Sequence, residues 1–327
     1  MSSVSFQTID ESNSGQRLDN FLLKVLKGVP KTYIYRIIRK GEVRVNKKRA
    51  QASTRLKDGD IVRIPPVRVS QPKELDDKSV ARHSYLLDGI LYEDNDVLVL
   101  NKPSGLAVHS GSGLQFGVIE LLRELTNYKF LELVHRLDRA TSGCLLLAKK
   151  RSVLTELSAA FANNNQKNNL LDKRYKALVM NGLESPSKMV IAPVSKRAMS
   201  AGEHKMVVVE EDQLEQSPGV QFAKTKFHTI ETFQYKKQSM SLLEAKLFTG
   251  RTHQVRVHAA HVGCQLLGDE KYGDYQCNKL MQSAGLNRLF LHASQLRFPH
   301  PIKKENITVT APLPKELDAV LKKIRQN

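Results

Sequence analysis

The sequence predicts an α+β protein with two parts, a small N-terminal α+β module and a larger domain built on a mixed, largely antiparallel sheet. Near the N-terminus, apolar residues recur at the three- and four-residue spacing of amphipathic helices. Beyond Gly89, short apolar runs alternate with helical patterns, and TKFHTIETFQY and SLLEAKLF alternate with the period of two that suits antiparallel pairing. A chain of 327 residues is long enough for one sizeable core and an accessory module.

The N-terminal module begins with two predicted helices. The apolar stripe in LDNFLLKVL predicts a helix from Leu18 that ends before Pro30. A second helix is expected over Lys31–Lys40, with its isoleucines inward, its cations outward and Gly41 as a natural stop. The alternating valines of GEVRVN and the apolar run Ile61–Pro65 then predict short strands.

Positive charge is concentrated in this module. The whole chain has a formal net charge of +18, and the segment Gly15–Arg68 holds 15 Lys and Arg against 4 Asp and Glu, a local +11 that leaves +7 for the rest. Such a surface attracts polyanions through phosphate contacts and counterion release, so nucleic acid is the favoured partner. Solubility or an anionic membrane remain alternative reasons for positive charge.

The later elements follow a linker. Residues 69–88 mix proline, serine and both charges without a clean period, which predicts a linker. The sequence beyond it predicts a hairpin in ILYEDNDVLVLNKP, a helix over Val118–Thr126, a strand in CLLLAKK, a helix over Ser152–Asn163, a strand in YKALVM and a short helix from Lys315. The stretch Ser185–Val220 carries no recognisable motif.

Composition disfavours several classes of protein. The first residues are polar, and no stretch of about 18 uncharged apolar residues occurs, which predicts no membrane segment and a cytoplasmic location. The three cysteines are widely spaced and form no CxxC pair, so neither a disulfide framework nor a thiolate zinc site is indicated.

Two polar segments interrupt the apolar runs of the larger domain. HRLDRATSG places Arg136 and Arg139 on either side of Asp138 in a loop between strands. A charged loop is usually only solvated, but a second segment, TGRTHQVRVH, places Arg251 directly before a predicted helix. Arginine at a helix start favours an anion site.

These fragments resemble the pseudouridine synthases of the large-subunit ribosomal RNA and transfer RNA type. HRLDRATSG is similar to the family's catalytic-aspartate motif, KRYKALV to its tyrosine motif and TGRTHQVRVH to its arginine motif, with NKPSGLAVH and LNRLFLHA in support. The basic segment GQRLDNFLLKVLKGVPKTYIYRIIRKGEVRVNKKR resembles the S4 RNA-binding domain. The resemblance implies an S4-like domain over residues 1–68, a linker over 69–88 and a catalytic domain over 89–327.

The resemblance implies a role for each catalytic candidate. Asp138 would act as nucleophile or base toward the ribose, or as nucleophile toward the uracil ring. Arg251 would keep that carboxylate ionised, with Arg256 as the alternative. Tyr175 would stack on the extruded base and help to remove the C5 proton. Arg136 would fill the gap left by the flipped base, or contact a phosphate.

The resemblance also implies the partners. Structured RNA of the large ribosomal subunit is the expected substrate, at several uridines near the peptidyl-transferase region, and the reaction requires no cofactor and no metal. A monomer without a protein partner is expected. The expected RNA contacts are cations of the S4-like domain and of the catalytic domain: Arg36, Lys40, Arg44, Lys47, Lys48, Arg49, Arg136, Arg139 and Arg256.

Two functions of other classes compete with this interpretation. A non-catalytic RNA-binding protein would need only the N-terminal module and leaves the region beyond Gly89 unexplained. A metal-dependent RNA hydrolase is suggested by His253, His258 and His261, but their spacings of five and three differ from the i, i+4 pair of HExxH.

Overall fold

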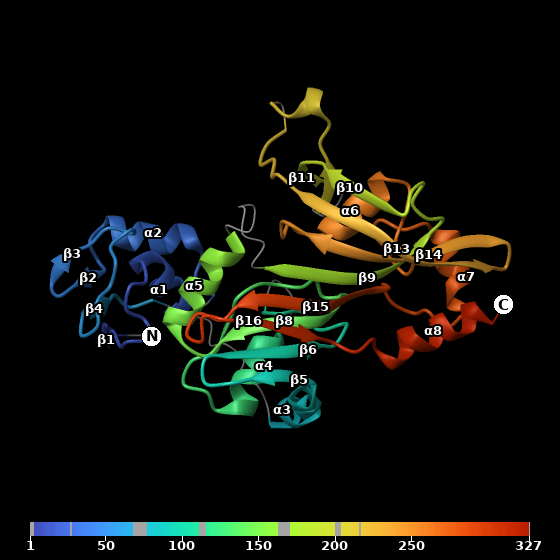
Figure 1. The fold of residues 1–327 in the computed structure, drawn as a ribbon. Helices are drawn as coiled ribbons and strands as arrows, with labels where there is room; N and C mark the ends of the chain where they lie inside the picture. The colour runs from blue at the N-terminus through green and yellow to red at the C-terminus, as the bar shows by residue number, and fades with distance from the viewer. Residues whose placement is uncertain are drawn as a thin grey trace. The chain divides into compact units, whose positions relative to one another are not determined.

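The computed structural model describes residues 3–26, 28–67, 77–110, 116–162, 171–199, 204–215 and 217–326 (Figure 1). The chain divides into two compact units, Met1–Asp76 and Asp77–Asn327, which are described separately. Residues 69–76 of the predicted linker lie outside the described residues.

The first unit is a small α+β module. Its two helices, α1 (Leu18–Val25) and α2 (Lys31–Arg39), follow the predicted amphipathic stripes and bury Leu18, Leu22, Ile34 and Ile37. They pack on a four-stranded sheet with the order β1-β4-β2-β3. Its strands are β1 (Ser5–Thr8), β2 (Arg44–Val45), β3 (Lys48–Arg49) and β4 (Ile61–Ile64).

The second unit is built around one large sheet. Its helices are α3 (Asp77–Arg82), η1 (Ser84–Gly89), α4 (Val118–Thr126), α5 (Arg151–Ala162), η3 (Glu211–Gln213), α6 (Gln254–His261), α7 (Tyr275–Gln282) and α8 (Lys315–Arg325). Its strands are β5 (Ile90–Glu93), β6 (Val97–Lys102), β7 (Glu132–Leu133), β8 (Ser142–Ala148), β9 (Asp172–Met180), β10 (Ser187–Ile191), β11 (Val194–Ala198), β12 (His204–Val208), β13 (Lys224–Tyr235), β14 (Gln238–Leu247), β15 (Leu291–Pro299) and β16 (Asn306–Thr310).

The strand order of the sheet confirms the predicted mixed, largely antiparallel fold. It runs β10-β13-β14-β9-β15-β8-β6-β5, with β16 beside β15 and β7 beside β8. All named pairs in this sheet are antiparallel except β15 with β8. Gly143 has a φ of +109°, and a Cβ at this position would lie 2.2 Å from the carbonyl oxygen of Ala293. The close approach of the parallel strands therefore requires glycine directly after the HRLDRATS segment.

Helices cover the sheet with two separate apolar clusters. One packs α7 and α8 against β9, β13 and β14, with Met281, Leu317 and Leu321 against Leu178 and Phe233. A second packs Val153 and Leu157 of α5 against β6, β8, β15 and β16. A smaller cluster joins Val257 of α6 to Val194 of β11 and to Tyr272. These packings position the start of α6 and the loop before β8.

The predicted linker is wrong in its second half. Helices α3 and η1 occupy Asp77–Gly89 and belong to the second unit, where Leu86 is 1% exposed. The sequence does not predict these two helices because each is only 6 residues long, which is too short to show a helical period. Within the described part of the chain, no helix has the length and apolar character needed to cross a membrane.

Candidate active site

Asp138 lies in the loop between β7 and β8, and the segment after β6 supports this loop. The Thr141 N–H donates to the Asp138 carbonyl at 3.1 Å, which closes a turn after the aspartate. The Nζ of the fully buried Lys102 donates to the carbonyls of Leu106 at 2.8 Å and Arg139 at 3.3 Å. Burial lowers the pKa of Lys102 to about 7. The backbone carbonyls of Asp138 and of the residue after it are therefore both fixed.

The second segment of the site joins β14 to α6. The side-chain oxygen of Gln254 accepts from Thr249 Oγ1 at 2.7 Å and from the Arg251 N–H at 3.0 Å. His253, directly before α6, has a left-handed backbone with a φ of 55°. Its imidazole lies beside Asp138, with Nε2 3.9 Å from Oδ2.

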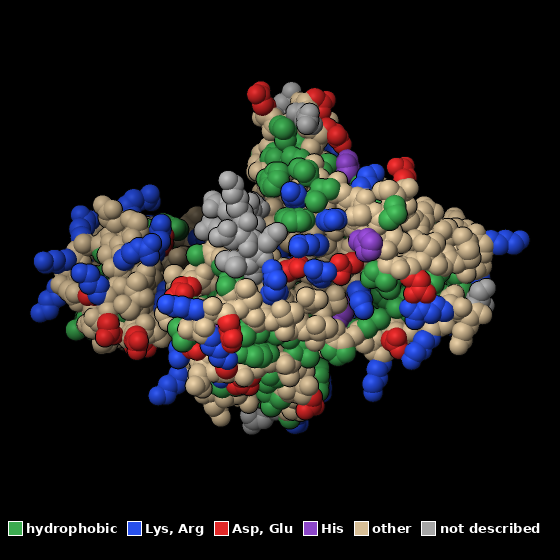
Figure 2. Space-filling view, viewed as in Figure 1, with side chains coloured by type: hydrophobic (Ala, Val, Ile, Leu, Met, Phe, Trp, Pro, Cys, Tyr) green, Lys and Arg blue, Asp and Glu red, His purple; other side chains and the backbone are tan. Residues whose placement is uncertain are grey.

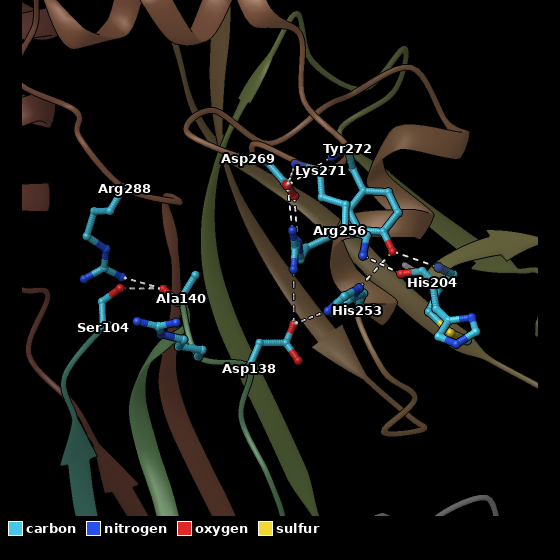
Figure 3. A network of polar contacts seen from close by, with 12 residues as sticks. Ser104, Asp138, Ala140, His204, His253, Arg256, Asp269, Lys271, Tyr272 and Arg288 are labelled. Atoms are coloured by element: carbon cyan, nitrogen blue, oxygen red, sulfur yellow. Dashed lines mark hydrogen bonds and ion pairs between the residues drawn. The ribbon is translucent and has the colours of Figure 1, made fainter. Parts of the chain in front are cut away.

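Arg256 of α6 connects Asp138 to a buried carboxylate. Its Nη1 lies 3.6 Å from Asp138 Oδ2, and its Nε and Nη2 each donate at 2.7 Å to Asp269 (Figure 3). The Asp269 side chain is 0% exposed and also accepts the N–H groups of Lys271 at 2.9 Å and Tyr272 at 3.1 Å. Asp269 therefore fixes the guanidinium that faces Asp138.

The prediction that Arg251 pairs with Asp138 is wrong, because the ion pair is formed by Arg256. The Nε of Arg251 instead donates to the Phe222 carbonyl at 3.0 Å. The left-handed turn at His253 intervenes between the two arginines, so that Arg256, on the helix, reaches the aspartate.

Tyr175 faces Asp138 across a cavity of about 60 Å³ that Arg251 and His253 also line. It projects from β9 on the side opposite Leu178, since neighbouring positions of a strand alternate between faces. Burial raises the pKa of Tyr175, and the charge of Asp138 adds to the increase. Tyr175 is 8% exposed and forms a wall of the cavity.

A larger cavity of about 260 Å³ adjoins the first and shares Arg136, Tyr175 and Arg251 with it. Lys173 contributes to its lining, and burial together with the charge of Arg251 lowers the pKa of Lys173 to about 8. Arg136 is exposed, and within the described ranges no side-chain hydrogen bond or ion pair engages its guanidinium. Arg139 is exposed too, but its Nε donates to the Gly105 carbonyl at 2.8 Å. The entrance to the site is therefore cationic.

Comparison with known proteins identifies the family of this site. Residues 96–261 match the family described as RNA pseudouridylate synthase, and residues 16–62 match the S4 domain. Ribosomal large subunit pseudouridine synthase C of Yersinia pestis is 47% identical over 326 residues, covering 99% of this chain and 97% of that protein. The protein of the same name from Escherichia coli strain K12 is 46% identical over 330 residues, covering 99% and 97%. The chain belongs to the RNA pseudouridylate synthase family.

Solved structures agree with this assignment. Human RNA Pseudouridylate Synthase Domain Containing 4 superposes with a TM-score of 0.58 at 27% identity, covering 76% of this chain and 97% of that chain. Human RNA Pseudouridylate Synthase Domain Containing 1 has a TM-score of 0.57 at 24% identity over 71% of this chain and 86% of that chain, and shows the same fold. The chain is thus an RNA pseudouridine synthase with an N-terminal S4 domain.

The S4 domain exposes the cations that the sequence singled out. Figure 2 shows lysine and arginine side chains over the surface of this unit. The turn between β2 and β3 uses Asn46 and Lys47 with φ of 49° and 66°, as tight hairpins do. Arg49 donates to the Lys40 carbonyl at 3.1 Å, which links the hairpin to the end of α2. The exposed cations of the helix end and the hairpin are Arg36, Lys40, Arg44, Lys47, Lys48 and Arg49.

The three histidines of the hydrolase hypothesis do not converge. His253 faces Asp138, whereas the buried His258 donates from Nε2 to the Ala192 carbonyl at 2.9 Å and His261 is exposed. Among the described residues, the one group that meets the geometric criteria for a metal site is Asp94, Asp96 and His300, which includes none of these three.

Sequence patterns alone do not assign several residues of the site. The histidine pattern suggests only a metal ligand at His253, although this residue lies inside the TGRTHQVRVH motif. Lys102 also lies within a quoted motif, NKPSGLAVH. Asp269 and Tyr272 lie in GDEKYGDY, where no spacing or repeated charge indicates chemistry. Position within a motif could have identified the first two, but only the folded chain identifies the others.

Proposed function

We propose that this enzyme isomerises uridines of large-subunit ribosomal RNA to pseudouridine, at several sites near the peptidyl-transferase region. The observation that carries this proposal is the similarity, over 99% of the chain, to proteins named ribosomal large subunit pseudouridine synthase C. The basic S4 domain supports it, because phosphate contacts position an enzyme on structured RNA without reading its sequence. One pocket that accepts any flippable uracil can then act at several sites.

The chemistry is assigned to Asp138. The reaction breaks the N1–C1′ bond, turns the uracil and joins C5 to C1′, after which C5 loses a proton and N1 gains one. The ionised carboxylate acts as nucleophile or base toward the ribose, or as nucleophile toward the uracil ring. Its position beside Arg256, at the edge of a cavity lined by Tyr175, supports this role. The balance requires no redox partner and no nucleoside triphosphate.

Substrate binding requires the uridine to leave its stack, at a cost of about a few kcal/mol. The guanidinium of Arg136, which has no hydrogen-bond or ion-pair partner among the described residues, lines both cavities, and this supports a role in filling the vacated space. Tyr175 offers a ring for stacking and a hydroxyl for removal of the C5 proton. Arg251 and Lys173 line the larger cavity, where their charge suits the phosphates beside the flipped nucleotide.

The S4 domain is proposed to hold the RNA through the cations of α2 and the β2–β3 hairpin. We further propose that the enzyme is cytoplasmic. We propose that it acts as a monomer, because the contacts around Asp138 need no residue from a second chain. The domain limits are proposed as residues 1–68 for the S4 domain and Asp77–Asn327 for the catalytic domain, since α3 and η1 belong to the second unit.

Pseudouridine mapping of ribosomal and transfer RNA tests the substrate. RNA from cells that lack the protein should lose pseudouridine at large-subunit positions, and wild-type protein should restore it. An Asp138→Asn protein expressed at the same level serves as the control and should restore nothing. Loss confined to transfer RNA would show that the ribosomal assignment is wrong while the chemistry stands.

A further inference from the structure

The two carboxylate oxygens of Asp138 have different surroundings. Oδ2 faces Arg256 Nη1 at 3.6 Å and His253 Nε2 at 3.9 Å. In the part of the chain that the structure describes, no side chain forms a hydrogen bond or ion pair with Oδ1, and Figure 3 shows this oxygen pointing away from Arg256 and His253. Both distances exceed a hydrogen bond, and such contacts tighten when the substrate complex forms.

Tyr272 determines which nitrogen of His253 carries hydrogen. Its hydroxyl oxygen accepts the Met206 N–H at 3.0 Å, so the hydroxyl hydrogen needs an acceptor elsewhere. His253 Nδ1 lies 2.8 Å from the same oxygen and is the acceptor that the described residues offer. A neutral imidazole that accepts at Nδ1 carries its hydrogen on Nε2. The Nε2–H is therefore the group that faces Asp138.

The imidazole is also held in place and kept neutral. The His253 and Tyr272 rings meet edge to face, with centroids 5.5 Å apart. Burial lowers the pKa of His253, and the positive charges of Arg256 and Lys271 act in the same direction against the opposing effect of Asp138. A neutral donor orients a carboxylate without neutralising it.

We propose that His253 is a positioning residue that, together with Arg256, holds Oδ2 of Asp138 and leaves Oδ1 to react with the nucleotide. Tyr272 acts through His253 by keeping the hydrogen on Nε2. The role of His253 rests on the proposed role of Asp138 as the reacting carboxylate. Because Met206 belongs to β12, the β11–β12 hairpin is the outer end of this hydrogen-bond chain.

Substitutions at His253 distinguish the loss of a correctly placed hydrogen-bond donor from a general effect on the fold. In the full-length protein, His253→Ala should slow single-turnover pseudouridine formation on the order of 10²-fold, with the RNA Kd changed less than twofold. His253→Gln should recover at least tenfold of that loss, because its amide nitrogen can reach the Nε2 position. His253→Asn is the matched control, since asparagine tolerates the left-handed backbone but its amide ends at the Nδ1 position. Equal rates for Gln and Asn would overturn the proposal.

Tyr272→Phe tests the coupling while retaining the buried ring. It should slow the reaction several-fold in the wild-type background and have no further effect in His253→Ala. An equal loss in both backgrounds would show that Tyr272 does not act through His253. Tyr275→Phe, which removes a hydroxyl from a residue that is 78% exposed, should match wild type.

Asp138→Asn, assayed in parallel, distinguishes failure of this inference from failure of the proposed function. An active Asp138→Asn enzyme would refute the proposed role of the carboxylate. An inactive Asp138→Asn enzyme together with a wild-type rate for His253→Ala would refute the positioning role alone.

Discussion

Replacement of Arg256 by methionine should destabilise the fold as well as abolish activity. The guanidinium is paired with the fully buried Asp269, and methionine leaves that carboxylate without its partner. Breaking a buried pair from one side costs about 3–5 kcal/mol, and we expect the lower end because Asp269 keeps two backbone N–H donors. For a domain of this size, about 3 kcal/mol corresponds to a fall in Tm of about 6–12 °C.

Thermal unfolding and single-turnover kinetics together test this magnitude. Asp138→Asn should lower Tm by less than about 2 °C, because Asp138 is 19% exposed and its ion pair is long at 3.6 Å. Adding Asp269→Asn to Arg256→Met removes the unpaired charge, so the double variant should regain most of the lost Tm. It should remain inactive, since Asp138 still lacks its cation.

Two results would refute this account of Arg256. The first is an Arg256→Met protein with a wild-type Tm, which would show that Asp269 does not depend on the pair. The second is a double variant that recovers activity along with stability, because the contact between Arg256 and Asp138 would then be dispensable.

Three further predictions concern binding, the tyrosine and pH. The double variant with glutamine at Lys47 and Lys48 should show a slope of log affinity against log salt that is smaller by about 1.4–1.8 in RNA titrations. An unchanged slope would show that these lysines do not contact phosphate. Tyr175→Phe should bind RNA normally but slow C5-proton release by about 10²-fold or more, a result that a stacking role alone would not give. His292 is buried with its pKa lowered to about 4, mainly by burial, against about 6.5 in the unfolded chain. As the pH falls, the unfolded chain therefore binds a proton at His292 before the folded protein does, and the free energy of unfolding should fall by about 3 kcal/mol between pH 6.5 and 4. The fall should be smaller in His292→Gln. Identical pH profiles of stability for the wild type and this variant would contradict the prediction.

Local periodicity made most of the fold predictable. The spacing of apolar residues in LDNFLLKVL and their alternation in TKFHTIETFQY each predict an element with one buried face. Helix α1 and strand β13 form in these two segments. Strand β1 was missed because its pattern is weak and Phe6 is 64% exposed. The β11–β12 hairpin was missed within Ser185–Val220 because its strands mix apolar with basic residues such as Lys196 and Arg197.

The candidate site was predictable where a motif holds the residue, and unpredictable where the partner lies elsewhere in the chain. The sequence brought Asp138 and the 251–256 segment together, but it could not choose between Arg251 and Arg256. That choice depends on the left-handed turn at His253 and on Asp269, which fixes Arg256 from a loop without a motif. Such tertiary contacts leave no local pattern to read.

Tritium release from RNA labelled at C5 of uridine tests directly whether the carboxylate of Asp138 performs the reaction. Asparagine keeps the shape of the side chain and removes the nucleophile, so the Asp138→Asn enzyme should bind RNA with a Kd within about threefold of wild type, less than 1 kcal/mol. It should release no tritium above background in a single turnover. Release at the wild-type rate by this variant would show that the reaction does not depend on the Asp138 carboxylate.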